Sequence, residues 1–371
     1  PSRWFGAGST GRPIPSGETQ RASERPTRIP TRRLGGPVGR YGEHGRGRLL
    51  PPRGVCRVMR VHFPGRAFDY QTLRALSYTT FGGAEPGEVL TTAERIAEGD
   101  TGSWHEEWRR TAERVDRLAA RAREAGHERT ARDAGLRAHT YYRTAEFFLD
   151  PADPRRPPTY RASRAAFREA LPALDADAQP IEIPYEGTTL PGYRFLPPGA
   201  ASDDPRPVVV CLGGFDSLCE ELYFLCGVPE ALARGYAVLS FEGPGQGSPL
   251  REAGLTARPD WEHVVGPVLD YLDGEPWAGG STGLVGASFG GYYAPRAAAF
   301  EERVDAVVAF DHMHDLQSAS AGGNEALARL LLRAPDVVVN GLAALGTRLG
   351  GVEARWLMAN SRWVFGVASA A

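Results

Sequence analysis

The sequence predicts an α/β protein in which a doubly wound, mostly parallel β-sheet follows a helical region. Three observations support this fold class. Short apolar runs alternate with helical patterns after residue 180, the stretch before it has helical periodicity, and a Gly-x-Ser-x-Gly motif joins an apolar run to an Ala-rich helix. We therefore expect a lead over residues 1–58, a helical cap region over 59–178 and an α/β core over 179–371.

The lead differs in composition from the rest of the chain. It carries twelve arginines against three glutamates, a charge of +9, so the remainder carries −11 of the net −2. Gly and Pro are frequent and no apolar period is present, which favours disorder over a nucleic-acid-binding domain. The first methionine is Met59, so we expect the lead to be either upstream sequence translated in frame or an unrelated tail.

The cap region has the 3.6-residue apolar period of amphipathic helices. A capping motif begins at Thr91, and Asp150-Pro151 breaks the chain before the last helix of the region. A short Asp/Ala/Pro stretch from Asp175 to Pro180 is the expected linker to the core. The predicted helices are Thr91–Glu98, Trp104–Ala125, His127–Phe148 and Tyr160–Leu174.

The core begins with two alternating runs, which are typical of half-exposed strands, joined by a turn at Glu186-Gly187. Continuous apolar runs then predict buried parallel strands. The predicted strands are Ile181–Tyr185, Thr188–Phe195, Val208–Leu212, Ala237–Phe241, Gly283–Val285 and Val304–Phe310. Helices are expected at Trp261–Leu272, Ala326–Leu332, Val337–Leu349 and Glu353–Val367.

The segment from Gly283 to Gly291 carries the strongest functional signal. A short strand, a Gly-x-Ser-x-Gly turn centred on Ser288 and the start of a helix form the context that a nucleophile elbow requires. The flanking glycines permit a sharp turn that exposes the serine hydroxyl. A structural turn is the alternative for the motif alone, but its setting and an upstream Gly-Gly loop favour Ser288 as a nucleophile.

Two backbone segments are candidates for stabilising an oxyanion near this serine. The Gly-Gly loop at Gly213–Ser217 follows a buried strand, and its N–H groups can face a developing negative charge without a side chain in the way. Phe289 lies at a helix N-terminus, where partial positive charge favours an anion. Gly214 or Phe215, together with Phe289, would form a two-donor oxyanion hole.

These residues resemble the α/β-hydrolase superfamily, and within it the group of FrsA-like esterases, dihydroxypseudooxynicotine hydrolase and fungal hydrolases that shorten polyketide pigment precursors. The resemblance runs over about residues 60–320. It is carried by Tyr141-Tyr142-Arg143, Tyr160-Arg161, Leu212–Ser217 with Glu220-Glu221, Phe241–Gly247, Asp260-Trp261-Glu262 and the elbow through Tyr293. It implies a serine hydrolase with a helical cap, often dimeric, that acts on ester or carbon–carbon bonds next to a carbonyl.

The superfamily order is nucleophile, then acid, then histidine, each after a strand. The only histidine-containing cluster after Ser288 is Asp311-His312-Met313-His314-Asp315. Asp311, His312 and His314 are therefore alternative candidates for the acid and base. The interpretation that we prefer is that the last strands, with the acid and the histidine, lie beyond Ala371, so we expect little turnover from these 371 residues alone.

The sequence predicts a small-molecule substrate and no cofactor or metal. We expect no nucleic-acid partner and no membrane partner, since no run of eighteen apolar residues exists, and a homodimer is possible within the group. Four cysteines do not form a disulfide framework in a chain of this length, so reduced cysteines and a cytoplasmic location are expected.

Other interpretations remain open at the level of sequence. A catalytically incomplete binding protein on the same fold is one, and a prolyl-oligopeptidase-like peptidase is another. The loop Glu242–Gly247 lacks the Lys-Ser/Thr of a phosphate-binding loop, and the His-x-His-Asp cluster is a weak metal signal. The sequence does not choose between ester, thioester, amide and carbon–carbon substrates.

Overall fold

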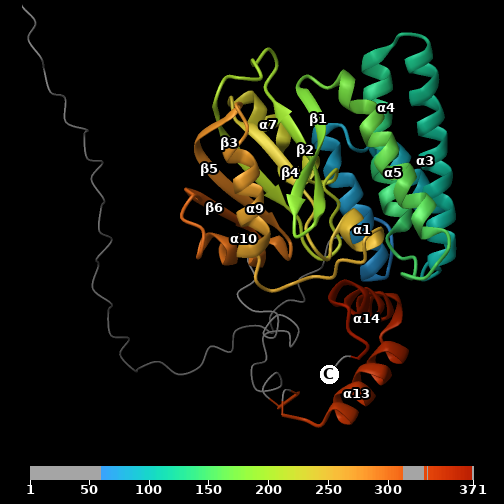
Figure 1. Ribbon diagram of the computed structural model, residues 1–371. Coiled ribbons are helices and arrows are strands. Elements are labelled where there is room, and N and C mark those ends of the chain that lie inside the picture. Colours follow the sequence, from blue (N-terminus) through green and yellow to red (C-terminus); the bar gives the residue numbers. More distant parts are fainter. Residues whose placement is uncertain (1–59, 312–329, 332, 370–371) are drawn as a thin grey trace, which may run out of the picture. The chain divides into compact units, whose positions relative to one another are not determined.

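The protein is described from a computed structural model, for residues 60–311, 330–331 and 333–369. Its described strands form a six-stranded sheet in the order β1-β2-β4-β3-β5-β6 (Figure 1). The first three strands of that order pair antiparallel, and β4, β3, β5 and β6 pair parallel. This confirms the predicted fold class. The strands are β1 (Asp177–Tyr185), β2 (Thr188–Leu196), β3 (Arg206–Leu212), β4 (Ala237–Phe241), β5 (Ala278–Ala287) and β6 (Ala306–Phe310).

The hairpin of β1 and β2 begins the sheet. Glu186 and Gly187 both have positive φ, +40° and +81°, as a two-residue hairpin turn with the twist of a β-ribbon requires. The predicted linker up to Pro180 is wrong at its end, because β1 already begins at Asp177. Pro180 lies in β1, an edge strand of the described sheet, and proline within sheets is found mainly on edge strands.

The described residues before the sheet form helices, three of which pack side by side as neighbours (α3, α4 and α5 in Figure 1). The Asp100 side chain caps α3 by accepting from the N–H groups of Gly102 and Ser103. The longest of the described helices, α3, carries charged residues on its exposed face, and no helix in the described part combines the length and apolarity needed to cross a bilayer. The helices are α1 (Arg66–Ser77), α2 (Pro86–Arg95), α3 (Thr101–Glu124), α4 (Glu128–Glu146) and α5 (Arg156–Ala170).

The predicted start of a helix at Thr91 is wrong. Helix α2 begins at Pro86, where Glu85 caps it by accepting from Glu88 N–H. Proline is favoured at a first helical position because its missing N–H would be unpaired there. The Thr-Thr-Ala-Glu motif therefore lies inside the helix, and the Thr92 hydroxyl donates back to the Glu88 carbonyl at 2.7 Å.

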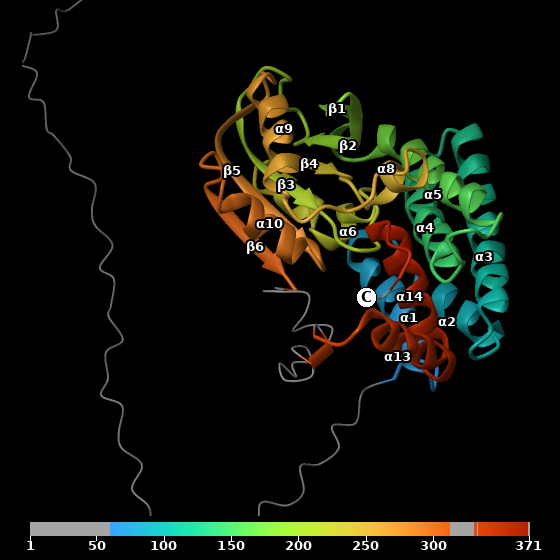
Figure 2. The ribbon, with the colours of Figure 1, turned by 60° about the horizontal axis from the view of Figure 1, so that its bottom comes forward.

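The sheet separates two apolar cores, because successive side chains of each strand point to opposite faces. In β4, Val238 joins the core on the side of the cap helices, whereas Leu239 joins the core on the side of α9 (Glu262–Asp273) and α10 (Gly290–Ala298). Figure 2 shows the sheet between these two groups of helices. The first core also contains α6 (Leu222–Leu225) and α7 (Val228–Ala233).

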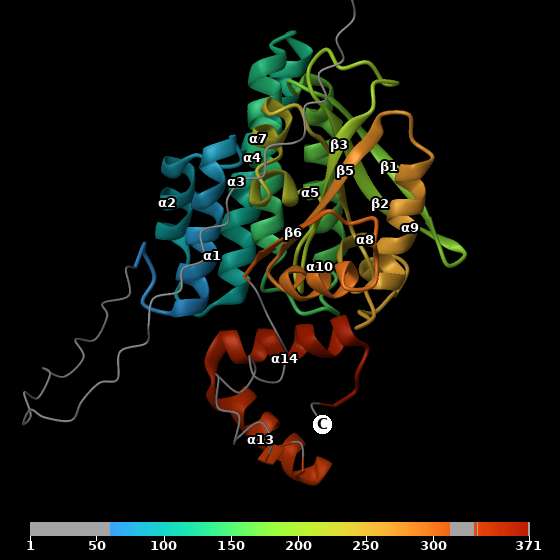
Figure 3. The ribbon, with the colours of Figure 1, turned by 90° about the vertical axis from the view of Figure 1, so that its left-hand side faces the viewer.

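In the described residues after the sheet lie the helices α13 (Asp336–Leu349) and α14 (Gly351–Phe365), and Figure 3 shows α14 between α13 and the sheet and cap helices. The Trp356 indole N–H donates to the Phe147 carbonyl at 2.7 Å, and the two rings stack with centroids 4.5 Å apart. In α13 no residue is buried. The predicted helix Ala326–Leu332 falls largely outside the described residues, and the predicted lead lies outside them altogether.

We expect Trp356→Ala to loosen α14. The substitution removes a hydrogen bond and a stacked ring, a loss of about 1–3 kcal/mol. Hydrogen exchange of the amides of α14 should therefore become faster. The matched control is Leu357→Ala on the same helix, where the side chain is 51% exposed and exchange should stay unchanged. Equal effects of the two substitutions would contradict the packing role of Trp356.

Candidate active site

Ser288 stands at the corner between β5 and α10. Its backbone is left-handed, with φ of +58°, which is uncommon for a residue with a side chain. Two hydrogen bonds hold this conformation: Ser288 N–H donates to the Phe310 carbonyl at 2.9 Å, and Gly291 N–H donates to the Ser288 carbonyl at 2.8 Å. Ser288 itself is exposed, although both of its neighbours in the chain are buried. This is the geometry of a nucleophile elbow.

The glycines of the motif are required by close backbone contacts. A Cβ added at Gly286 would lie 2.0 Å from the Gly290 carbonyl oxygen, and one added at Gly290 would lie 2.8 Å from the Gly213 carbonyl oxygen. Real side chains do not reach such distances, so the elbow closes only with glycine at both positions. The second contact also brings the loop after β3 against the elbow.

The loop after β3 meets the elbow at Gly214. A Cβ at this residue would lie 2.4 Å from the Phe289 backbone nitrogen, so the two backbones are in direct contact. The Gly214 N–H donates to the Ser217 hydroxyl at 3.2 Å. The N–H groups of Phe215 and Phe289, in contrast, have no hydrogen-bond partner within the described part of the chain. The structure thus brings the residues Gly214, Phe215 and Phe289 close to one another near Ser288.

A cavity of about 470 Å³ lies next to Ser288 between the elbow, α1 and α14. Phe147 and Phe148 of the cap region line this cavity, whereas Trp104 and Tyr141 are fully buried in the cap. The volume is that of an ordinary small-molecule site. The aromatic lining residues are Tyr70, Phe147, Phe148, Phe215, Phe310 and Trp356, and the polar ones include Arg66, Gln71, Arg74, Asp216, Asp311 and Glu353.

Asp311 follows the last residue of β6 and lines the same cavity as Ser288. Its backbone is also left-handed, with φ of +67°. His312 and His314, the other two acid and base candidates, lie outside the described residues. Among the described residues that line the cavity none is a histidine.

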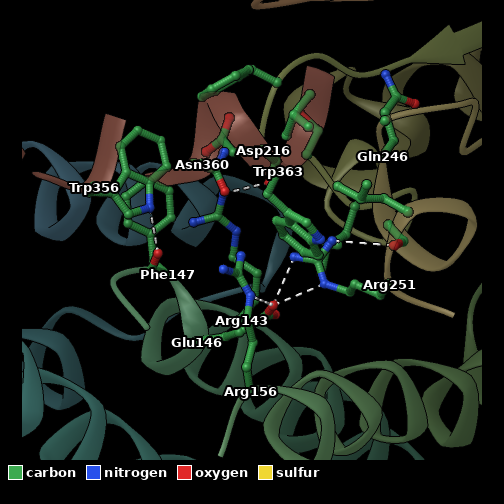
Figure 4. Close-up of a pocket in the computed structure, with 17 residues that line it drawn as sticks. Arg143, Glu146, Phe147, Arg156, Asp216, Gln246, Arg251, Trp356, Asn360 and Trp363 are labelled. Carbon is green, nitrogen blue, oxygen red and sulfur yellow. Dashed lines mark hydrogen bonds and ion pairs between the residues drawn. The ribbon is translucent and has the colours of Figure 1, made fainter. Parts of the chain in front are cut away.

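A second, water-sized cavity of about 20 Å³ lies between the cap helices, the loop after β4 and α14 (Figure 4). Glu146 accepts hydrogen bonds from Arg156 at 2.8 Å and from Arg251 at 2.8 Å beside it. Burial would raise the pKa of Glu146, but the charges of Arg251 and Arg156 outweigh burial and lower it. Both guanidinium groups also lie over the ring of Trp363, which joins α14 to the cap.

Glu242 and Gln246, from the loop after β4, support the Gly-Gly loop from behind. The Gln246 side chain donates to the Gly213 carbonyl at 2.6 Å and accepts from Gly243 N–H at 2.9 Å. The buried Glu242 carboxylate accepts from the N–H groups of Cys219 and Ser248 at 3.0 and 2.7 Å. Nothing in the sequence pattern assigned these supporting roles.

Cys219, Glu220 and Glu242 place potential metal ligands within 4.8 Å of one another. Burial, followed by the charges of the two glutamates, raises the pKa of the Cys219 thiol, which disfavours the thiolate that binds metals. Tyr193 donates to Glu220 at 2.7 Å, and Arg164 lies 3.6 Å from the same oxygen. Each of the two carboxyl groups is thus bound by N–H or O–H donors of the protein, and with a protonated thiol beside them the three groups fit a metal centre poorly.

Burial and the nearby Glu220 charge raise the pKa of Glu242 to about 7. The folded protein then keeps a proton that the unfolded chain loses near pH 4.5, so the free energy of unfolding should fall by about 1–3 kcal/mol as pH rises from 5 to 8. Glu220→Gln removes the neighbouring charge and should reduce that fall. Urea unfolding of the unmodified protein and of Glu220→Gln at several pH values checks this. Because the other titrating groups are common to both proteins, parallel plots of unfolding free energy against pH would contradict it.

Comparisons with known proteins agree with this geometry. The chain is 40% identical over 326 residues to "Hydrolase LUC6" of Fusarium sp, covering 82% of this chain and 75% of that protein. It is 39% identical over 331 residues to "20-hydroxy-prefusarin hydrolase FUS2" of Gibberella moniliformis, with 82% and 75% covered. The solved structure of 2,6-dihydroxy-pseudo-oxynicotine hydrolase is similar, with a TM-score of 0.58, 25% identity, and 78% and 75% covered.

The relatives bear hydrolase names, and the solved structure has the α/β-hydrolase fold that the sequence resembled. The chain is therefore a hydrolase by descent, as expected from its elbow. The sequence pattern of the family described as "Esterase FrsA-like" matches residues 88–352, which takes in the cap helices α3, α4 and α5, the sheet and the elbow. The protein belongs to the FrsA-like esterase family of α/β-hydrolases.

Proposed function

We propose that the protein hydrolyses an ester, or a carbon–carbon bond next to a carbonyl, with Ser288 as nucleophile and an acyl-serine intermediate. The observation that carries the proposal is the left-handed turn at Ser288, which exposes its side chain beside a cavity of about 470 Å³. Ser288 is kept in this left-handed conformation between the close backbone contacts at Gly286 and Gly290. A non-glycine residue held in this way is typical of a functional site.

In the proposed reaction, the Ser288 hydroxyl loses its proton to a base and its oxygen attacks the substrate carbonyl carbon. The oxyanion would accept hydrogen bonds from Phe289 N–H and Phe215 N–H, both without a partner in the described residues. Gly214 N–H is the weaker candidate because it already donates to Ser217. Each such donor contributes about 3–4 kcal/mol in comparable enzymes.

The tetrahedral intermediate collapses when the bond to the leaving group breaks. The protonated base then returns its proton to the leaving group, which departs from an ester as an alcohol, or from a carbon–carbon substrate as a carbanion that is stabilised by its own carbonyl and then protonated. Water then hydrolyses the acyl-serine and frees the acid. Asp311, at the strand end beside the elbow, is the alternative candidate for the acid, and His312 or His314 is the alternative candidate for the base.

The cavity favours a mainly apolar small organic substrate with a few oxygen groups. Aromatic rings supply much of its lining, and Gln71 supplies a hydrogen-bond donor at one side. The relatives named for 20-hydroxy-prefusarin and 2,6-dihydroxy-pseudo-oxynicotine are both named for hydroxylated compounds, which agrees with this class. The three described cysteines, Cys211, Cys219 and Cys226, are free.

A fluorophosphonate probe tests the nucleophile, since its reaction needs one attack by serine and no deacylation. We expect the adduct on Ser288, and its loss in Ser288→Ala. Ser77→Ala is the matched control, because Ser77 lines the same cavity but donates to the Arg74 carbonyl; it should be labelled at the rate of the unmodified chain. Peptide mass spectrometry locates the adduct. An adduct at another residue, or binding of substrate-like esters without any adduct, would instead favour a non-catalytic binding protein.

Gly214→Ala tests the oxyanion hole. The new Cβ would lie 2.4 Å from the Phe289 nitrogen, so the loop must move and the two donors separate. Loss of one donor costs about 10²–10³-fold in rate, and we expect a fall of this order in the rate of Ser288 phosphonylation. Gly341→Ala, in open space on α13, is the control and should change nothing. An unchanged rate in Gly214→Ala would exclude this loop from the reaction.

A further inference from the structure

We infer that Arg74 of α1 and Arg143 of α4 are positioning residues for the catalytic step, because they hold the loop that carries the Phe215 N–H. Both come from the helical cap, which is otherwise expected to act as a cover for the cavity. The inference depends on the proposed function, in which Phe215 is an oxyanion donor. It assigns the cap a part in transition-state stabilisation.

The first contact lies next to the donor. Asp216 follows Phe215 directly, and its carboxylate is shared by two guanidinium groups: Arg74 Nη1 lies 2.5 Å from Oδ2, and Arg143 Nη2 lies 3.1 Å from the same oxygen. Arg143 also donates to the Asp216 carbonyl at 3.4 Å. Both the backbone carbonyl and the side-chain carboxylate of Asp216 are thus bound by arginine. The backbone beside Phe215 is therefore held in position, and the charge of Asp216 is balanced.

The second contact lies at the far end of the same loop. Arg74 Nη2 is 2.8 Å from Glu221 Oε2, and Arg143 Nε is 3.0 Å from Glu221 Oε1. The Tyr78 hydroxyl donates to Glu221 as well. Each arginine therefore bridges Asp216 and Glu221, so the pair joins both ends of the segment 216–221 to the cap.

The four charges form a closed and buried set. Side-chain exposure is 14% for Arg74, 4% for Arg143, 15% for Asp216 and 0% for Glu221. Two positive and two negative charges balance, and removing one partner would leave a buried carboxylate without compensation, which is costly. Burial alone would raise the pKa of Asp216, but Arg74 and Arg143 outweigh it and lower that pKa.

The opposite side of the loop is held by the sheet. Gln246 donates to the Gly213 carbonyl, and Gly214 is in backbone contact with Phe289. Phe215 thus lies between a part of the loop fixed by the core and a part fixed by the two arginines. A shift of about 1 Å at such a donor is enough to slow a reaction about 10²-fold. The arginines, rather than the donor itself, set this position on the cap side.

Arg74→Met and Arg143→Met test the inference in the full chain. Hydrogen exchange of the amides 213–221 should become about ten-fold faster or more as the loop opens more often. The maximal rate of Ser288 phosphonylation should fall about 10–100-fold, whereas the concentration of probe for half-maximal rate should change little. This split separates positioning from a loss of binding or of folded protein.

Arg137→Met is the matched control. Arg137 lies on the same helix as Arg143 and pairs with Glu88 at 3.0 Å, away from the loop, so neither readout should change. Asp216→Asn keeps the shape of the side chain and removes its charge. It should reproduce the faster exchange and the slower phosphonylation expected of the two arginine variants. If either arginine variant does not fold, Asp216→Asn serves as the test of the inference.

The outcomes separate the two levels of the proposal. Unchanged exchange of 213–221 in folded Arg74→Met, Arg143→Met and Asp216→Asn overturns the inference, whatever Ser288 does. Faster exchange with an unchanged phosphonylation rate also overturns it, because the loop would then be held without effect on the reaction. Faster exchange in a protein whose Ser288 never reacts supports the hold on the loop and overturns the proposed nucleophile instead.

Discussion

The left-handed backbone at Ser288 is the constraint on which the rest of the site depends. A residue with a side chain adopts it at a cost, so the surrounding backbone must hold it in place. Here the bond from Ser288 N–H to the end of β6 and the contact of Gly286 with Gly290 do so. The same packing presses the loop after β3 against Phe289. One tight turn therefore fixes the nucleophile and brings the candidate oxyanion donors together.

The surroundings of that turn explain why so many charges are buried near it. A loop rich in glycine has little side-chain packing of its own and needs polar anchors. The loop after β4 supplies two on the sheet side, Glu242 and Gln246, which bind backbone groups. The cap supplies arginines on the other side. Fully buried carboxylates are tolerated in both places because each has a guanidinium or several N–H donors beside it.

The sequence predicted the elements whose pattern is local. The limits of β4 agree residue for residue, and the position of Ser288 followed from its strand, turn and helix. The start of α2 did not follow from the sequence, because a capping motif that lies inside a helix looks the same as one at its N-terminus. The anchors of the loop were beyond prediction from one sequence: Arg74 and Asp216 are 142 residues apart, and no period or spacing relates them. Phe147 and Trp104 share a helical pattern, yet only the fold places one in the cavity and the other in the core.

The central claim is that elbow and loop form one preorganised site for a tetrahedral intermediate. A crystal structure of the chain after reaction with a fluorophosphonate tests this most directly. We predict a phosphorus–oxygen bond to Ser288, with the phosphoryl oxygen about 2.7–3.1 Å from both Phe215 N and Phe289 N, and the loop at Gly214 still in contact with the elbow. A phosphoryl oxygen that points to solvent, with both N–H groups unpaired, would contradict the claim.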